Sequence, residues 1–580
     1  MKRCPECRRD YYDETLLFCL DDGQTLLDGP ASTGSIPPAS AAGQFDDGPQ
    51  TAILHETATP NEAETRAQTI HTTEQTAVLP PGISELRYAN GFNKRWLFAP
   101  LILAVIVLGG FFGYRYATQA KQIESIAVMP FANDSGNADV EYLSDGMTET
   151  LIKSLSSLPG MDVKPRSAVF RYKGKDTDIP TIGKELNVQA VLNGRVTQRG
   201  DQLTLSLELV DVQRNRVIWT EQYQRRQADV VSLQSEIAKD LSAKLSPRLS
   251  GSDETKVSKQ ATTDPAAYQA YLRGRFLWNR RTGENLDKAI EQFQAAIDRD
   301  PNYALAYAGL ADVYSIYRDY SINAPADSMS RAEAYAKSAI SIDGQLAEPH
   351  ATLGNVYYNR LQWAESESEY KKAIELNPNY PTAYHWYAVL LFSLGRNGEA
   401  EAAIMRAHQL DPLSAIISQN VAQAYRMKGD HDAAIETCQR IIDLDPNFPG
   451  CHFAIAWTYL KTGRNNEAIA EFQKAVELNG RYSTTLAELA VAFAASGRKE
   501  DTLVLLKELE ERFAKKQANG SDIATVYAAL GDKDKAFEWL EEDISARNPR
   551  FAEFRWSPAS EPLRNDPRYN DLLRRMNLPE

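Results

Sequence analysis

The chain has 580 residues, a length that corresponds to about four domains of ordinary size. Its net charge of −14 excludes a chain that is built throughout to bind nucleic acid. Five cysteines, unevenly placed, are too few for a disulfide framework. Each domain must therefore be held together by its own apolar core or by a bound metal.

Residues 1–27 contain a Cys-x2-Cys pair, a third cysteine and an aspartate where a second pair would place its last ligand. Zinc prefers four such ligands in a tetrahedral set, so we predict one structural zinc held by Cys4, Cys7, Cys19 and Asp22. A knuckle held by apolar side chains alone is the alternative, although about 25 residues build too small a core. The CPxC…FCxxDG pattern resembles small bacterial zinc ribbons, from which Asp22 departs.

Residues 28–92 are rich in Pro, Gly, Ala, Ser, Thr and Gln, so we predict a disordered linker. Thr51 and Thr76 each precede a leucine by three residues in the related stretches QTAIL and QTAVL. These stretches resemble phosphothreonine motifs that forkhead-associated domains read, which implies that both threonines are phosphorylated. Chance in a Thr-rich and Ala-rich linker is the alternative.

Residues 96–116 are predicted to form a single transmembrane helix, because the first 19 of them are uncharged and almost wholly apolar. The cysteine-rich amino end favours a reducing cytosol, so we expect the protein in a bacterial inner membrane with residues after about 120 outside the cytoplasm. Gly109 and Gly113 form a GxxxG spacing that lets two spans pack as a homodimer; helix flexibility is the alternative.

Residues 121–250 read as a compact α/β domain. Strands are expected at 126–131, 161–163, 190–197, 203–210 and 217–223, with helices at 140–158, 179–186 and 228–245. The stretches SIAVMPFAN, IGKELNVQAVLNGRV and VIWTEQYQR resemble the FlgO-like or TolB amino-terminal-like domain. In relatives this domain lies between a membrane span and helical repeats, as in CadC-like regulators and kinase-linked sensors, which implies a sensor-like half. No kinase signature occurs in the sequence.

Residues 265–550 are predicted to form one array of helical repeats, with a period of 34 between residues 344 and 480. Five helix-breaking residues mark the period: Gly344, Pro378, Pro412, Pro446 and Gly480. Small residues recur twelve positions before each mark: Ala332, Ser366, Ala400, Ala434 and Ala468. The pattern resembles tetratricopeptide repeats, which implies an α-solenoid whose units contact only their neighbours. Residues 551–580 are expected to cap its carboxy-terminal end.

The resemblance also implies a binding groove for a protein or an extended peptide on one face of the first helix of each repeat. That face carries Asp312, Asn355, Tyr358, Asn359, His385, Phe392, Gln419, Gln423, Arg426, Phe453, Trp457 and Lys461. Packing of the aromatic residues against the next repeat is the alternative. No Lys or Arg stands at the positions that clamp a terminal carboxylate in some relatives, which argues against a carboxy-terminal peptide as the ligand.

We expect no enzyme, because the sequence has no G-x-S-x-G, H-E-x-x-H or P-loop motif. The predicted fold class is a multidomain chain: a short zinc-ribbon-like amino terminus, one transmembrane helix, a small α/β domain and an α-solenoid.

The sequence leaves two candidate functions. One is a membrane-anchored scaffold or sensor whose extracytoplasmic repeats bind a protein partner. The other is a signalling or transcription-related regulator that acts through the cytoplasmic ribbon and linker. We expect a protein or peptide as partner rather than nucleic acid, which only this second function would involve.

Overall fold

The computed structural model describes residues 123–580, apart from 159, 246–258, 281, 321–324, 556 and 580, and three short strands near the amino terminus. Those strands pair antiparallel in the order β2-β1-β3 and comprise β1 (Lys2–Arg3), β2 (Asp10–Tyr11) and β3 (Leu27–Asp28). The chain divides into two compact units, Met1–Leu101 and Ile102–Glu580.

Several predictions fall outside the described residues: the zinc ligands, Thr51, Thr76, Gly109, Gly113 and the membrane span at 96–116. Within the part of the chain that is described, no helix is long and apolar enough to cross a bilayer.

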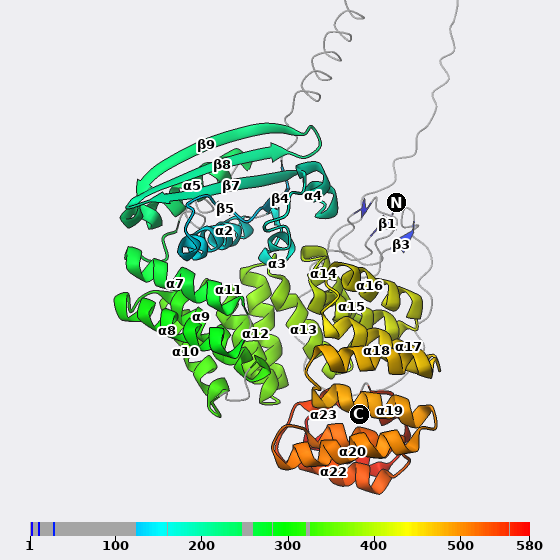
Figure 1. Ribbon diagram of the computed structural model, residues 1–580. Helices are drawn as coiled ribbons and strands as arrows, with labels where there is room; N and C mark the ends of the chain where they lie inside the picture. Colours follow the sequence, from blue (N-terminus) through cyan, green and yellow to red (C-terminus); the bar gives the residue numbers. More distant parts are fainter. Residues whose placement is uncertain are drawn as a thin grey trace, which may run out of the picture. The chain divides into compact units, whose positions relative to one another are not determined.

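A mixed sheet forms the centre of the α/β domain (Figure 1). Its strand order is β6-β4-β7-β8-β9, with β5 also paired to β7. β7 runs parallel to β4 and β5, and then forms an antiparallel meander with β8 and β9. The strands are β4 (Ser125–Val128), β5 (Ala132–Asn133), β6 (Asp162–Val163), β7 (Ala190–Arg199), β8 (Gln202–Asp211) and β9 (Arg216–Arg226). The predicted hairpin is confirmed, with Val196 opposite Leu205.

The alternation of leucine with polar residues in β8 explains why the sheet has one covered face. Leu203, Leu205, Leu207 and Leu209 are all buried, whereas Ser206 between them is exposed. Each buried leucine contributes about 1.5–3 kcal/mol by leaving water. The helices of the domain are α2 (Glu141–Ser156), α3 (Arg166–Phe170), α4 (Ile179–Glu185) and α5 (Val230–Leu245), and α2 and α5 lie against the leucine face (Figure 1).

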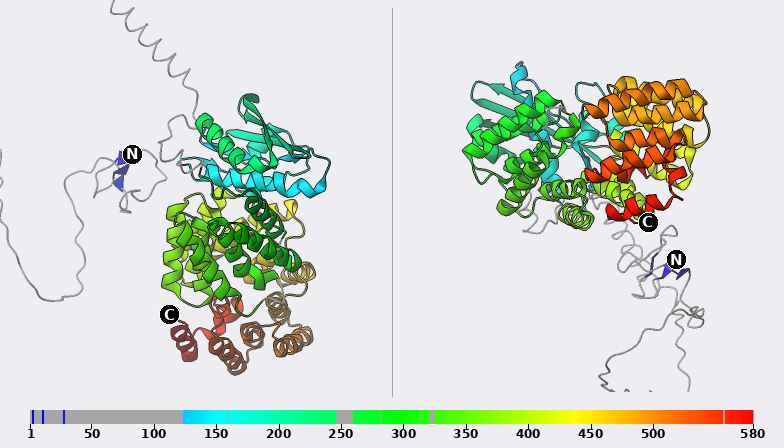
Figure 2. Two further views of the ribbon diagram at one scale, coloured as in Figure 1. Left: turned by 90° about the vertical axis from the view of Figure 1, so that its left-hand side faces the viewer. Right: turned by 90° about the horizontal axis from the view of Figure 1, so that it is seen from below.

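The rest of the unit is a solenoid of antiparallel helix pairs, as the period of 34 predicts (Figures 1 and 2). The first helices of the pairs are α7 (Pro265–Trp278), α9 (Ala304–Tyr320), α11 (Ala347–Asn359), α13 (Pro381–Ser393), α15 (Ala415–Lys428), α17 (Pro449–Lys461), α19 (Ser483–Ala495) and α21 (Gly520–Ala529). The second helices are α8 (Gly283–Arg299), α10 (Ser328–Ile342), α12 (Trp363–Leu376), α14 (Asn397–Leu410), α16 (His431–Leu444), α18 (Asn465–Leu478), α20 (Lys499–Ala514) and α22 (Lys533–Ser545).

Close packing between the paired helices accounts for the small residues of the repeat. The five predicted small positions, from Ala332 to Ala468, are all fully or almost fully buried. Gly354 shows how little room remains, since a Cβ atom there would lie 2.5 Å from the ring of Tyr370. A larger side chain at such a position would force the two helices apart.

The turn inside each repeat supplies a second series with the same period. A left-handed backbone occurs at Gly395, Gly429, Gly463, Gly497 and Gly531, with φ between 73° and 83°. Leu361 takes the equivalent place in an earlier repeat with a φ of 61°, although a side chain disfavours that conformation. The sequence contains this glycine series, whereas the predicted period rests on the other set of helix breakers, from Gly344 to Gly480.

The final segment, residues 550–579, comprises α23 (Arg550–Phe554), η4 (Pro558–Leu563) and α24 (Pro567–Arg575), and we call it the strap. It packs on α21 and α22, as expected of a cap. It also reaches back to much earlier repeats (Figure 2): the indole Nε1 of Trp363 donates to the carbonyl of Met576 at 2.9 Å. The expectation that units contact only their neighbours is therefore wrong for the strap.

Candidate partner-binding groove

Three of the predicted groove residues are buried in the packing between repeats. Tyr358 and Phe392 are 7% and 3% exposed, and the hydroxyl of Tyr358 lies 3.0 Å from Oγ of Ser393. Nε2 of His385 lies 2.7 Å from Nδ2 of Asn420 on the next first helix, and burial lowers the pKa of His385 to about 4. These side chains hold adjacent repeats together and present little surface to a partner.

The other predicted residues of α11, α15 and α17 are half-buried, apart from Lys461, which is exposed. On α15 and α17 they form what we call the groove strip: Gln419, Gln423, Phe453 and Trp457. The rings of Phe453 and Trp457 lie 5.4 Å apart. Phe453 also meets the ring of Phe472 edge-on at 5.6 Å, so it packs against the second helix of its own repeat as well as facing the groove. Asn355 and Asn359 hydrogen-bond to each other on α11.

One side of the groove is covered by the α/β domain through buried ion pairs. Glu149 of α2 accepts from Nε of Arg275 at 2.6 Å and pairs with Arg166 at 3.1 Å. Arg275 also pairs with Asp312 at 3.2 Å. Burial alone would raise the pKa of Glu149, but the charges of Arg275 and Arg166 lower it. Asp312, predicted as a groove residue, is committed to this network.

Further contacts extend this interface along α11 to α15. Lys153 pairs with Glu348 at 2.7 Å, and Nδ2 of Asn379 donates to the carbonyl of Met161 at 2.9 Å. The hydroxyl of Ser167 donates to Oδ2 of Asp411. Asp411 is 3% exposed, its Oδ1 has no hydrogen-bond partner among the described residues, and burial raises its pKa to about 6.

The strap covers the other side, at the carboxy-terminal ends of the first helices. Nη1 of Arg555 donates to the carbonyl of Ser393 at 3.1 Å, and Glu561 pairs with Lys461. Ser557 lies beside Glu488 of α19, which is 3% exposed. Burial raises the pKa of Glu488 to about 7, against the opposing effects of Ser557, Trp457 and Arg426.

Arg426 stands between the groove strip and the strap. Its guanidinium lies 4.5 Å from the centre of the Trp457 ring. Burial lowers its pKa to about 10, and it forms no ion pair within the described ranges. The carboxyl of Glu488 is the acidic group that acts on Arg426, but among the described residues no carboxylate forms an ion pair with this cation.

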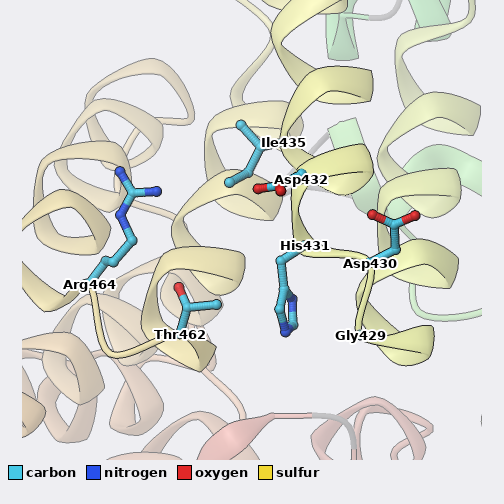
Figure 3. Close-up of a pocket in the computed structure, with 7 residues that line it drawn as sticks. All are labelled: Gly429, Asp430, His431, Asp432, Ile435, Thr462 and Arg464. Atoms are coloured by element: carbon cyan, nitrogen blue, oxygen red, sulfur yellow. The ribbon is translucent and has the colours of Figure 1, made fainter.

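A separate cavity of about 350 Å³ lies at the turns of two successive repeats (Figure 3). It is lined by Gly429, Asp430, His431, Asp432, Ile435, Thr462 and Arg464. Asp430 accepts from the backbone N–H of Ala433 at 3.1 Å, and Arg464 pairs with Glu467 at 3.0 Å. These charged side chains are therefore engaged in contacts within the turns and the helix starts that follow them. Among the residues that the structure describes, no three His, Cys, Asp or Glu side chains cluster as a metal site would require.

Family models match both parts of the described unit. Residues 121–240 match the second domain of HilA/YgeH-like transcriptional regulators. Residues 347–380, 369–402 and 425–489 match tetratricopeptide repeat models. The chain contains tetratricopeptide repeats. The resemblance of the α/β domain to FlgO-like or TolB amino-terminal-like domains stays a prediction.

Among curated proteins, the chain is 30% identical over 244 residues to a protein of Rhizobium meliloti (strain 1021) named "Putative adenylate cyclase 3". The match covers 42% of this chain and 42% of that protein, so the chain spans about two fifths of its length. Solved structures include Pseudomonas aeruginosa pilF, at 18% identity and a TM-score of 0.30 over 37% of this chain and 94% of that chain. The Cut9-Hcn1 hetero-tetramer of the APC/C has 15% identity and a TM-score of 0.38. That match covers 60% of this chain and 68% of the chain in that structure.

The two cysteines of the repeats, Cys438 and Cys451, are free and buried in one apolar cluster. The contact with the neighbouring Cys451, together with burial, raises the pKa of the Cys438 thiol well above its usual range. Both cysteines therefore pack as small apolar side chains of the repeats.

Proposed function

We propose that this protein is a membrane-anchored scaffold or sensor whose repeats bind a segment of a protein partner. In this proposal the amino end lies in the cytoplasm of a bacterial cell and the repeats lie outside it. The observation that carries the binding role is the groove strip, where amide and aromatic side chains line consecutive helices and stay half-exposed. Amides hydrogen-bond an extended backbone, and aromatic anchors dominate many interfaces.

Trp457→Ala tests the binding role. Truncating an interface anchor costs about 2 kcal/mol or more, so capture of the partner by the full chain should weaken at least ~30-fold. Partners would be captured from cell extract on the immobilised full chain, identified by mass spectrometry, and their affinity measured by titration. Undiminished affinity, with helical content retained, would remove Trp457 from the binding site.

Trp539→Ala is the matched control. Trp539 is also half-buried and packs edge-on against Phe513 at 4.9 Å, but it belongs to the second helix of its repeat. Its truncation should alter stability by a similar amount and leave partner affinity within about twofold. Equal loss in both variants would indicate a general effect on the solenoid.

A regulatory output is the second candidate. It is favoured by the match of residues 121–240 to a domain of transcriptional regulators, and by the name of the Rhizobium relative. In this version the α/β domain and repeats form a sensor half, and the amino-terminal ribbon and linker carry the signal. A salt-sensitive shift of DNA by the full chain would support it, and partner binding without any such shift would oppose it.

The amino-terminal features complete the proposal. We propose one structural zinc on Cys4, Cys7, Cys19 and Asp22, phosphorylation of Thr51 and Thr76, and no catalytic activity. Elemental analysis of the purified chain should find about one zinc, which a chelator removes.

The proposed membrane orientation is tested in intact cells with a membrane-impermeant thiol reagent. The reagent should fail to label the first three cysteines, and labelling would indicate the opposite orientation.

A further inference from the structure

The strap is more than an end cap because it contacts the groove side of repeats far from its own. Arg555 donates to the carbonyl of Ser393 on α13, and Trp363 on α12 donates to the carbonyl of Met576. Lys461 on α17 pairs with Glu561. The strap therefore lies along the carboxy-terminal ends of several first helices, where a partner in the groove would need to pass.

The strap pairs with Lys461 and acts on Glu488 through Ser557, but it leaves other polar atoms of the groove without a partner among the described residues. Arg426 has no ion pair within the described residues, although burial lowers its pKa. Oε2 of Glu488 and Nε1 of Trp457 are buried and lie close enough for Trp457 to lower the pKa of Glu488, but neither atom has a hydrogen bond of normal geometry to a described residue. A buried polar group without a hydrogen-bond partner costs free energy. A ligand that supplied the missing partners would therefore fit this surface better than the strap does.

We propose that the strap is a resident ligand of the groove, displaced by a partner segment that brings an acidic side chain to Arg426. A carboxylate there would accept from the guanidinium and stand within reach of the indole N–H of Trp457. This inference rests on the proposed binding function and adds its regulation: the groove is closed by the chain itself until such a partner competes.

Exchange of the strap can be measured without knowing the partner. The probe is a fluorescein-labelled synthetic peptide of residues 550–579, added to the full chain. In the double variant Arg555→Met and Glu561→Gln, the attached strap loses its contacts to Ser393 and Lys461. The native-sequence peptide should then bind this variant at least ~10-fold more tightly than the native chain, because competition from the attached strap is weaker.

Arg575→Met is the matched control. Arg575 also carries a strap ion pair, at 2.8 Å, but to Glu541 on the adjoining α22 and not across the groove. Peptide affinity should stay within about twofold of the native value. Equal peptide affinity for all three chains, or no binding to any, would overturn the proposal and leave the strap as a fixed cap.

Native-state hydrogen exchange gives a second measurement that needs no substitution. Amides of α24 should exchange at least ~10-fold faster than those of α21, which shows opening of the strap without global unfolding. Exchange of both helices at one common rate would contradict a displaceable strap.

The acidic partner is tested by Arg426→Gln. This change should weaken the captured partner at least ~10-fold and leave the affinity of the strap peptide unchanged, because the strap offers Arg426 no carboxylate. Equal loss of both would assign Arg426 to the strap contact. If instead Trp457→Ala leaves partner capture intact, the proposed binding function fails while the strap measurements still stand.

Discussion

The two sides of the groove are covered by different chemistry. The α/β domain is held by buried ion pairs that centre on Arg275, whose guanidinium contacts Glu149 and Asp312. The strap is held by apolar packing, by donors that reach main-chain carbonyls, such as Trp363 to Met576, and by ion pairs that are exposed, such as Lys461 to Glu561. Removing any one charge from a buried network is strongly destabilising, because its partner stays buried without a counter-charge. Apolar and main-chain contacts can be lost one at a time at a smaller cost in free energy. We therefore infer a permanent interface on one side and an exchangeable one on the other.

The sharpest test of this difference is Arg275→Met, which leaves Glu149 and Asp312 buried without their shared cation. Breaking a buried ion pair from one side costs about 3–5 kcal/mol. The free energy of unfolding of the full chain, measured in urea by tryptophan fluorescence, should fall by that amount. Arg299→Met is the control, because its pair with Asp264 is largely exposed and is worth only about 0–1 kcal/mol.

Glu488→Gln tests the strap side through pH. Burial raises the pKa of Glu488 to about 7, so the native state binds more protons than the unfolded state between about pH 4.5 and 7. Stability contributed by the neutral carboxyl is thus present below pH 4.5 and lost as the pH rises through 7. The amide variant should gain about 3 kcal/mol over the native chain at pH 8 and nothing at pH 4, as followed by urea titrations at both values.

Asp411→Asn is the corresponding test at the α/β interface. Its effect on stability should be smaller and should occur over a lower pH range than that of Glu488→Gln. Its pKa is raised to about 6, so the stability that the neutral carboxyl contributes is lost between about pH 4 and pH 6. The amide keeps an acceptor for Ser167 and should stabilise the chain by about 2–3 kcal/mol at pH 8. An unchanged pH profile in this variant would mean that water reaches the carboxylate.

The smallest expected effect comes from Trp363→Phe, which removes the indole N–H that the carbonyl of Met576 accepts. The loss of one buried hydrogen bond and some volume should cost about 1–2 kcal/mol. Hydrogen exchange should place the effect in α24 and α12 together. A loss confined to α12 would show that the strap contact contributes no stability.

The local architecture could be predicted from the sequence because it depends on short spacings. The 34-residue period and the alternation from Leu203 to Leu209 each follow from the geometry of one element, and both are confirmed. The missed glycine series at the inner turns has the same local origin, since a left-handed backbone favours glycine wherever it recurs.

The site was harder to predict because neighbours far along the chain decide exposure. The helix positions place Tyr358, His385 and Phe392 on the groove face, but the neighbouring repeat buries them. Asp312 faces the groove and is used by Arg275 of the preceding repeat. Helical spacing predicts the direction in which a side chain points. Which residues it then contacts depends on how the repeats pack in the superhelix.

The contact between Trp363 and Met576 joins residues 213 positions apart and turns part of the solenoid into a closed loop. An open array of repeats unzips from its ends, because each unit is stabilised only by its neighbours. While the strap is docked, α12 and α24 protect one another, so the intervening repeats should then melt in a single transition. Closing so long a loop costs entropy that local pairing does not, and the strap should dock last and slowly during folding.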